Sequence, residues 1–143
     1  MANQELSQAE WLDRAEAYCA RSEHCAADVR RKLYEWGTPP DLFDKIEEKL
    51  YSGDFLNDAR FCRAYVHDKV EYQAWGRVKI QTGLQALQLP SRAINEAMED
   101  IDERKYIENL CRLAETRRSD LPEKRLRFLL QRGFTYEEIK KCT

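Results

Sequence analysis

The sequence predicts an all-helical protein built from three tandem three-helix repeats, and two observations support this fold. The composition is 43% hydrophobic and 35% charged with only 5 Gly and 4 Pro, which favours helices and excludes disordered and collagen-like chains. A helix-turn-helix pattern also occurs three times within the 143 residues. One such unit cannot bury its apolar faces alone, so we expect the repeats to stack in an elongated, curved array that forms a single domain.

Three segments carry the repetition, and they align without gaps when Leu33, Leu84 and Leu129 are superposed. The segments are VRRKLYEWGTPPDLFDKI (29–46), IQTGLQALQLPSRAINEA (80–97) and RLRFLLQRGFTYEEIKK (125–141). In each segment an amphipathic helix ends shortly after the leucine, a short turn follows, and a second helix begins. The offsets between the leucines are 51 and 45 residues, which gives the length of one repeat.

The turn after each anchoring leucine carries residues that suit a helix end. Gly37 and Gly133 stand just past the helix, where a left-handed backbone would make a side chain clash. The middle copy departs from the pattern, because it has Gln88 at this position. We nevertheless expect one structural corner in all three repeats.

The second helix of each pair begins with residues typical of a helix N-terminus. Thr38 with Asp41, and Thr135 with Glu138, place a hydroxyl acceptor and an acid three residues apart, the arrangement that caps free N–H groups. Prolines fit the first turn, whose N–H groups have no helical partner, at Pro39, Pro40 and Pro90.

A further helical stretch precedes each pair and completes the repeat. These stretches cover roughly 7–21, opened by the capping sequence SQAE, 58–74 after GDFLND, and 103–117. We therefore expect about nine helices, with repeat 1 at about 7–54, repeat 2 at about 55–101 and repeat 3 at about 102–143.

The N-terminus lacks a basic start and an apolar stretch, and no run approaches membrane-spanning length, so we expect a cytoplasmic protein with no membrane partner. The cysteines form an odd set without CxxC spacing, which fits buried or half-buried side chains in a reducing compartment: Cys19, Cys25, Cys62, Cys111 and Cys142. Cys19, His24 and Cys25 lie close in sequence, but a zinc site needs four ligands and no second pair has suitable spacing. We expect no metal site.

The net charge of −2 conceals an asymmetry between the two halves of the chain. Residues 1–71 carry 10 basic and 15 acidic groups, whereas residues 72–143 carry 14 and 11. The first half would repel a polyanion and the second half would attract one. Any contact with nucleic acid should therefore be one-sided and sensitive to salt.

Four segments form a combination more specific than the repeat alone. They are YCARSEHCAADVRRKLYEWG (18–37), GDFLNDARFCRAYVHDK (53–69), WGRVKIQTGLQALQLP (75–90) and KRLRFLLQRGF (124–134). The most specific parts are the run 55–61 with Tyr65, Gly76 at a helix start, and the Arg132-Gly133-Phe134 turn. Over nearly its whole length the chain resembles the RecX family of bacterial regulators of the RecA recombinase, a family built from tandem three-helix repeats.

The resemblance implies a non-catalytic protein that binds RecA filaments on DNA and restrains recombinase and coprotease activity in DNA repair and the SOS response. It implies no cofactor, and we expect a monomer. Many family members look basic, whereas this chain has a pI near 5.8. We therefore expect at most weak direct binding to single- or double-stranded DNA.

The first candidate binding region is a window from Tyr72 to Asn95 that contains no acidic residue, although 26 of the 143 residues are Asp or Glu. The window supplies cations and amides at Arg77, Lys79, Arg92, Gln73, Gln81, Gln85 and Gln88. Such side chains suit a partner that bears phosphates or carboxylates. A solvated helix face explains the pattern equally well, and the family resemblance favours binding.

The second candidate region is basic and carries Arg117, Arg118, Lys124, Arg125, Arg127 and Arg132. At 100° per residue, Leu126, Leu129 and Leu130 share one helix face, with Phe128 on the opposite face. Phe128 could stack on a base or enter a partner pocket, but packing against a neighbouring helix is the favoured interpretation. Phe134 should fold back on Leu129 or Leu130.

The stretch LRFLLQRGFTYEEI has the outline of a DNA-reading helix-turn-helix, but its second helix starts with carboxylates at Glu137 and Glu138. We therefore expect binding from the helix before the turn. Trp75 has a better chance of exposure than the other aromatic residues. Acids at the junction into repeat 3 have three possible roles, which are capping a helix, repelling DNA, or meeting a basic partner: Glu96, Glu99, Asp100, Asp102 and Glu103.

An enzymatic role is not expected. His24 and His67 are the only histidines, and neither has a nucleophile or carboxylate partner in a known motif. The chain also has no Gly-rich phosphate loop. Two alternatives to a RecA regulator are a nucleic-acid-binding helical-repeat module without RecA specificity and a helical-repeat scaffold for an unrelated protein.

Overall fold

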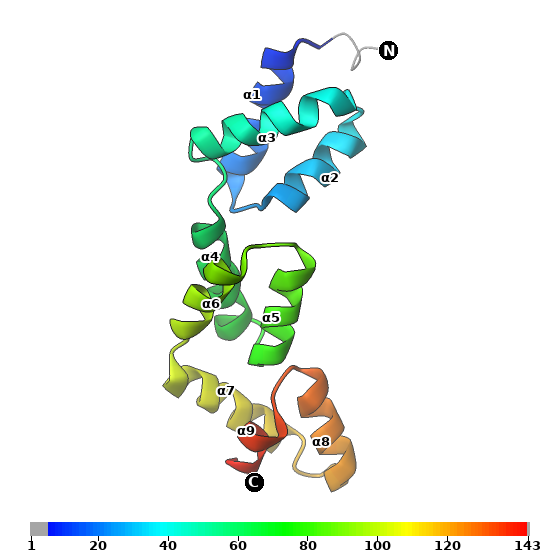
Figure 1. Ribbon diagram of the computed structural model, residues 1–143. Helices are drawn as coiled ribbons and strands as arrows, with labels where there is room; N and C mark the ends of the chain where they lie inside the picture. Colours follow the sequence, from blue (N-terminus) through cyan, green and yellow to red (C-terminus); the bar gives the residue numbers. More distant parts are fainter. Residues whose placement is uncertain (1–5, 143) are drawn as a thin grey trace. The chain divides into compact units, whose positions relative to one another are not determined.

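The computed structural model describes residues 6–142, and all regular elements in this range are helical (Figure 1). The α-helices are α1 (Gln8–Arg21), α2 (Ala26–Trp36), α3 (Phe43–Ser52), α4 (Asp58–Glu71), α5 (Arg77–Ala86), α6 (Ser91–Glu99), α7 (Glu103–Thr116), α8 (Pro122–Gln131) and α9 (Tyr136–Lys140). A short 3-10 helix, η2 (Pro40–Leu42), precedes α3. The predicted all-helical class is confirmed. The helical stretches predicted to precede each helix pair, at 7–21, 58–74 and 103–117, match α1, α4 and α7 within a few residues.

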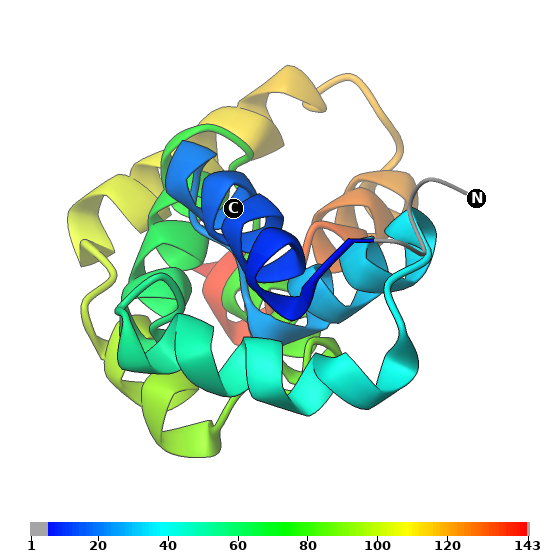
Figure 2. The same cartoon turned by 90° about the horizontal axis from the view of Figure 1, so that it is seen from above.

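The chain folds as two compact units, of which the first ends at Phe61 and the second begins at Cys62. In the first unit α1, α2 and α3 each contact the other two, and Figure 2 looks down on these three helices. Their shared core contains the fully buried Trp11, Leu33 and Leu50. The second unit contains α5 to α9 together with most of α4.

The repeated corner is present in all three copies. The anchoring residues Leu33, Leu84 and Leu129 are completely buried. Four residues after each anchor the backbone is left-handed, with φ of +79° at Gly37, +62° at Gln88 and +103° at Gly133. Five residues after each anchor a backbone N–H donates to the anchor's carbonyl, at 3.0, 3.5 and 3.2 Å. Gln88 therefore adopts the glycine conformation at some steric cost, which explains how the middle repeat keeps the corner.

Two of the three predicted N-terminal caps are confirmed, and the third is wrong. Ser7 with Glu10 and Thr135 with Glu138 each form a reciprocal capping box. Thr38 does not cap a helix; its side chain is buried, and its hydroxyl has no hydrogen-bond partner within the described residues. The reason is the proline pair, because the 3-10 turn η2 begins directly after Pro39 and separates Thr38 from α3.

The cysteines depart from the sequence prediction, because Cys111 and Cys142 form a disulfide. The C-terminal residues after α9 return to α7 and bring the two Cα atoms to 5.3 Å across 31 residues of sequence. Cys19, Cys25 and Cys62 are buried and form no disulfide within the described residues, and their burial was expected. Burial raises the pKa of Cys19 to about 11, so this thiol stays protonated and unreactive near neutral pH.

Backbone atoms of the second and third repeats are in direct contact at two glycines, Gly76 and Gly133. The Gly76 N–H donates to the Arg132 carbonyl at 2.7 Å, and the Val78 N–H donates to the Gly133 carbonyl at 3.0 Å. A Cβ on Gly76 would overlap the backbone carbonyl of Gly133, and a Cβ on Gly133 would meet Lys79. Glycine at both positions therefore lets the end of α8 lie against the start of α5 (Figure 1).

We predict that Gly76→Ala lowers the free energy of unfolding by about 3 kcal/mol, because the added methyl forces two backbones apart. Gly37→Ala is the control. Its Cβ would meet nothing within 4 Å, so only the left-handed backbone should cost about 1 kcal/mol. Urea unfolding followed by circular dichroism measures both. If Gly76→Ala cost no more than Gly37→Ala, the backbone contact would not be a tight one.

We also predict that Cys142→Ser lowers the free energy of unfolding by about 3 kcal/mol, because the disulfide closes a long loop in the unfolded chain. Dithiothreitol should lower the melting temperature of the wild-type protein and leave that of the Cys142→Ser variant unchanged. Thermal melts with and without reductant measure this. A wild-type melting temperature that did not respond to reductant would contradict the predicted stabilisation.

Candidate partner-binding surface

A groove lies between α5 and α8, within the second unit. We call it the α5–α8 groove; its volume is about 400 Å³, and its lining includes Tyr65, Trp75, Val78, Lys79, Leu130 and Gln131. Val78 is 52% exposed and Leu130 is 44% exposed, so both present apolar surface to solvent. Leu129 and Leu130 were predicted to share one helix face, but Leu129 is completely buried whereas Leu130 is exposed. The two side chains point about 100° apart on α8, and Leu129 alone reaches the core.

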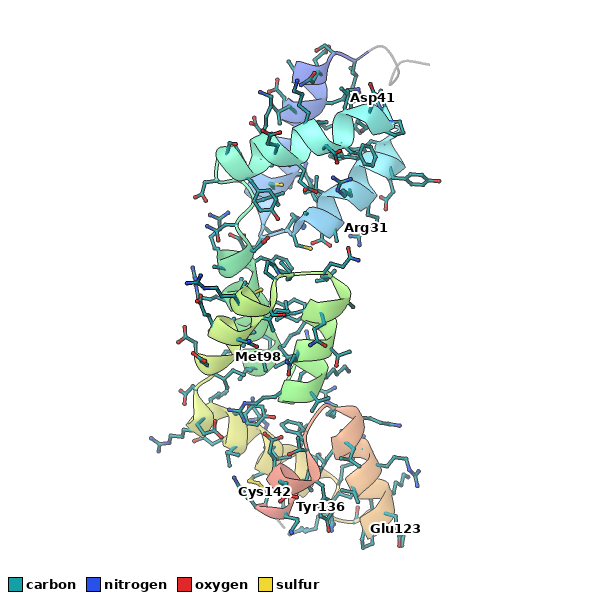
Figure 3. The ribbon with its side chains drawn as sticks, in the orientation of Figure 1. Arg31, Asp41, Met98, Glu123, Tyr136 and Cys142 are labelled. Atoms are coloured by element: carbon teal, nitrogen blue, oxygen red, sulfur yellow. A yellow bond between two sulfur atoms is a disulfide. The ribbon has the colours of Figure 1, made fainter. Side chains whose placement is uncertain are left out.

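Glycines keep the α5–α8 groove open. Gly83 and Gly133 line it, and neither adds a side chain. A Cβ on Gly83 would overlap the Tyr65 hydroxyl, so Gly83 lets α4 and α5 approach closely. Glu123, labelled in Figure 3, marks the start of α8 at the opposite end of this helix from α5.

Trp75 lines the groove, and two lysine ammonium groups lie against its ring. The Lys69 ammonium lies 4.6 Å and the Lys79 ammonium 4.3 Å from the ring centroid, and the Tyr65 ring meets it at 6.5 Å in an edge arrangement. Trp75 is half-buried, as Trp36 and Phe43 are, so the expectation that it is more exposed than the other aromatic residues is wrong. Its contacts hold positive charge beside the groove.

A second, basic cleft of about 270 Å³ shares Gln131 with the α5–α8 groove. Its lining includes Arg117, Lys124, Arg127 and Phe128. The guanidinium of Arg117 lies 4.0 Å from the Phe128 ring centroid, and Phe128 packs against the core of the third repeat. The packing interpretation of Phe128 is confirmed.

Lys124 and Arg127 are exposed, and neither forms an ion pair with any residue between 6 and 142. The other cations of this region have partners close in sequence. Arg117 pairs with Asp120 at 3.7 Å, Arg118 with Glu115 at 2.9 Å, and Arg125 donates to the Arg118 carbonyl at 3.4 Å. Lys124 and Arg127 are therefore the cations of α8 that remain available to a partner.

Arg77, a predicted binding residue, instead joins the second and third repeats. Its guanidinium pairs with Glu103 and, at 3.0 Å, with Glu138, and it lies 4.1 Å from the Tyr106 ring centroid. The Tyr106 hydroxyl donates to Glu138 at 3.0 Å and accepts the Arg77 backbone N–H at 2.9 Å. Burial raises the pKa of Tyr106 well above its ordinary value, so the hydroxyl remains a donor.

Arg132 and Arg92 also differ from the expected binding surface. Arg132 donates to the backbone carbonyls of Gln73 and Ala74 and so supports the turn before α5. Arg92 lies on α6, away from the lining of the groove, and pairs with Glu96 at 3.2 Å while remaining 90% exposed. Binding by Arg92 stays a prediction, whereas the guanidinium groups of Arg77 and Arg132 are occupied by the fold.

The acidic junction into the third repeat has at least two structural roles. The Asp102 side chain caps α7 by accepting the backbone N–H groups of Arg104 and Lys105 at 3.0 and 3.4 Å, and Glu103 pairs with Arg77. Capping, one of the three alternatives considered, is therefore confirmed for Asp102. Repulsion of DNA and contact with a basic partner remain predictions for the other acids.

Val78 and Leu130 were not predicted from the sequence as residues of a binding surface. A signal for Leu130 existed, because the repeat alignment places it at the position of Tyr34 and Gln85, directly after the anchoring leucine. Both of these equivalents are exposed. No comparable signal marks Val78, because its exposure depends on how α8 packs beside α5.

Within residues 6–142 the structure holds neither a cluster of metal-ligating side chains nor a helix that could span a membrane. Within residues 6–142 there is no group of three or more His, Cys, Asp or Glu side chains placed to hold a metal ion. His24 instead stacks on Tyr18 at 3.9 Å and contacts Ser22 and Asp28. No helix in the described part of the chain has the length and apolar character needed to cross a membrane.

Comparisons with known proteins converge on one family. The family model for the second three-helix domain of RecX matches residues 57–98, which hold α4 to α6. The chain is 30% identical over 132 residues to the Regulatory protein RecX of Geobacillus kaustophilus, covering 86% of this chain and 48% of the relative. It is 28% identical over 120 residues to that of Clostridium perfringens, covering 77% and 56%. The chain thus spans about half the length of these relatives.

Two crystal structures have a similar fold. One is a regulatory protein RecX with a TM-score of 0.83, for which the match covers 94% of this chain and 72% of that one. The other is RecX from Lactobacillus salivarius with a TM-score of 0.77, covering 94% and 93%. Sequence identity is 22% in both comparisons, so they establish a shared helical-repeat fold.

We predict that Arg77→Ala lowers the free energy of unfolding by about 2 kcal/mol, because Glu138 and Tyr106 lose a partly buried partner. Arg92→Ala is the matched control and should change it by less than about 0.5 kcal/mol, since the side chain of Arg92 is 90% exposed. Urea unfolding of both variants measures the difference. Equal effects would show that the Arg77 network contributes no more than a surface ion pair.

Proposed function

Because the chain belongs to the RecX family, we propose that it is a regulatory protein that binds RecA filaments on DNA and restrains their recombinase and coprotease activity. In this role it acts in the cytoplasm, in DNA repair and the SOS response, as a non-catalytic protein without a cofactor. The resemblance of the sequence to RecA regulators supports the choice of partner. Occupancy is the mechanism, since a bound regulator prevents extension of the filament or productive pairing of its DNA.

The observation that carries the proposal is the combined surface of the second unit. It joins the apolar α5–α8 groove, where Val78 and Leu130 are exposed, to a basic cleft whose Lys124 and Arg127 have no ion-pair partner within residues 6–142. An apolar centre beside a charged border is typical of protein interfaces. A nucleoprotein filament offers both a protein surface and phosphates to such a surface.

A second candidate function is direct nucleic-acid binding without RecA specificity. Lys124 and Arg127 favour it, because unpaired cations suit phosphates. Two features count against a base-reading role. The Trp75 ring has cations against it and the Phe128 ring packs in the fold, so neither offers a free face for base stacking. The first turn of α9 also carries Glu137 and Glu138 rather than cations or amides.

We predict that the purified protein inhibits DNA-stimulated ATP hydrolysis by RecA from the same organism at substoichiometric ratios. Arg127→Glu should weaken the inhibition, because it reverses an unpaired charge on the proposed surface. Arg104→Glu is the matched control, since Arg104 is an exposed arginine on α7 outside this surface. A titration of RecA ATPase activity with the three proteins measures this.

Absence of inhibition at every ratio would contradict the proposed function. Inhibition that requires tight binding to naked DNA, with an affinity that falls steeply as salt increases, would favour the second candidate.

A further inference from the structure

We propose that the α5–α8 groove binds an acidic amphipathic segment of the partner protein, with its apolar side chains in the groove and its carboxylates against the bordering cations. This inference rests on the proposed function for the identity of the partner, but the chemistry of the segment follows from the groove itself. It defines the class of sequence that the regulator would recognise.

The apolar part of the argument comes from side chains that the fold leaves uncovered. Val78 from α5 and Leu130 from α8 are about half exposed and line the same groove, beside the half-buried Trp75. A volume of about 400 Å³ is enough for a few apolar side chains. Burial of an exposed leucine or valine against a partner removes apolar surface from water, so it favours binding.

The charge part of the argument comes from the border of the groove. Lys79 lines the groove, and no residue from Tyr72 to Asn95 is acidic. The neighbouring basic cleft, which shares Gln131 with the groove, supplies Lys124 and Arg127, and neither has an ion-pair partner in the described chain. Cations in and beside an apolar groove complement a segment whose polar face carries carboxylates, and they disfavour a basic segment.

The nearby acids do not cancel this charge. Asp68 lies 3.6 Å from Lys69, whose ammonium contacts the Trp75 ring, and Asp120 pairs with Arg117 at 3.7 Å. Neither acid lines the α5–α8 groove, and Asp120, which lines the basic cleft, pairs there with Arg117 and leaves Lys124 and Arg127 without an acidic partner among the described residues. The groove therefore keeps its positive border. A nucleic acid would need free aromatic faces on which its bases could stack, whereas the lining offers exposed aliphatic side chains, so a protein segment with carboxylates is the favoured ligand.

The test uses fluorescein-labelled peptides and fluorescence anisotropy on the full chain. The first probe is a helical peptide with leucine on one face and glutamate on the other. Two further probes replace the glutamates with lysine, or the leucines with serine. We expect the leucine-glutamate peptide to bind, and both altered peptides to bind at least about tenfold more weakly, because each lacks one of the two complementary features.

Two variants locate the site. Leu130→Glu should weaken binding of the leucine-glutamate peptide at least about tenfold. Leu121→Glu is the matched control, because Leu121 is 70% exposed and lies outside the groove, and it should bind as the wild type does. Lys79→Glu should weaken binding of the leucine-glutamate peptide and strengthen binding of the peptide in which lysine replaces glutamate. Circular dichroism should give wild-type helix content for all three variants.

Three results would overturn the proposal. The first is equal binding by the Leu130→Glu and Leu121→Glu variants. The second is displacement of the peptide by a single-stranded oligonucleotide that itself binds in a Leu130-dependent manner, which would make the groove a nucleic-acid site. The third is a Leu130-dependent dimer in sedimentation experiments, which would make a second copy the occupant. The peptide assay contains no RecA, so a failed RecA titration overturns the proposed function alone.

Discussion

The contact between Gly76 and Gly133 sets how closely the second and third repeats pack. Two backbone hydrogen bonds join Gly76 and Val78, at the start of α5, to the carbonyls of Arg132 and Gly133, directly after α8, and no side chain separates the two glycines. Because this contact fixes the end of α8 against the start of α5, it also brings Leu130 and Val78 to one groove. A bulkier junction would move the two walls of that groove apart.

The same junction explains why a cation that the sequence suggested for partner binding has a structural role instead. The start of α5 is buried against the third repeat, so Arg77 meets Glu138 and Tyr106 from α9 and α7. Lys79, two residues further along α5, points to the groove instead. Arg77 and Lys79 lie in the same acid-free window but on different faces of α5, so Arg77 joins the two repeats whereas Lys79 faces the groove.

The parts of the fold that depend on local chemistry could be predicted from the sequence. Buried Leu33, Leu84 and Leu129 and the corner after each of them follow from apolar spacing and helix-ending residues. The Cys111–Cys142 disulfide and the partners of Arg77 could not be predicted, because they join residues that are distant in sequence. Their positions depend on how α9 packs against α7, which no local pattern encodes.

The side chains of the proposed surface are largely distinct from those that stabilise the fold. At the repeat position of Leu130 the other copies have Tyr34 and Gln85, so the corner itself does not require an apolar residue there. Exposure of apolar side chains to water is unfavourable, whereas their burial against a partner would stabilise the complex. Lys124 and Arg127 likewise lack ion pairs within the described chain. Substitutions at these positions should therefore change binding with little effect on folding, whereas changes at Arg77 or Gly76 act through stability.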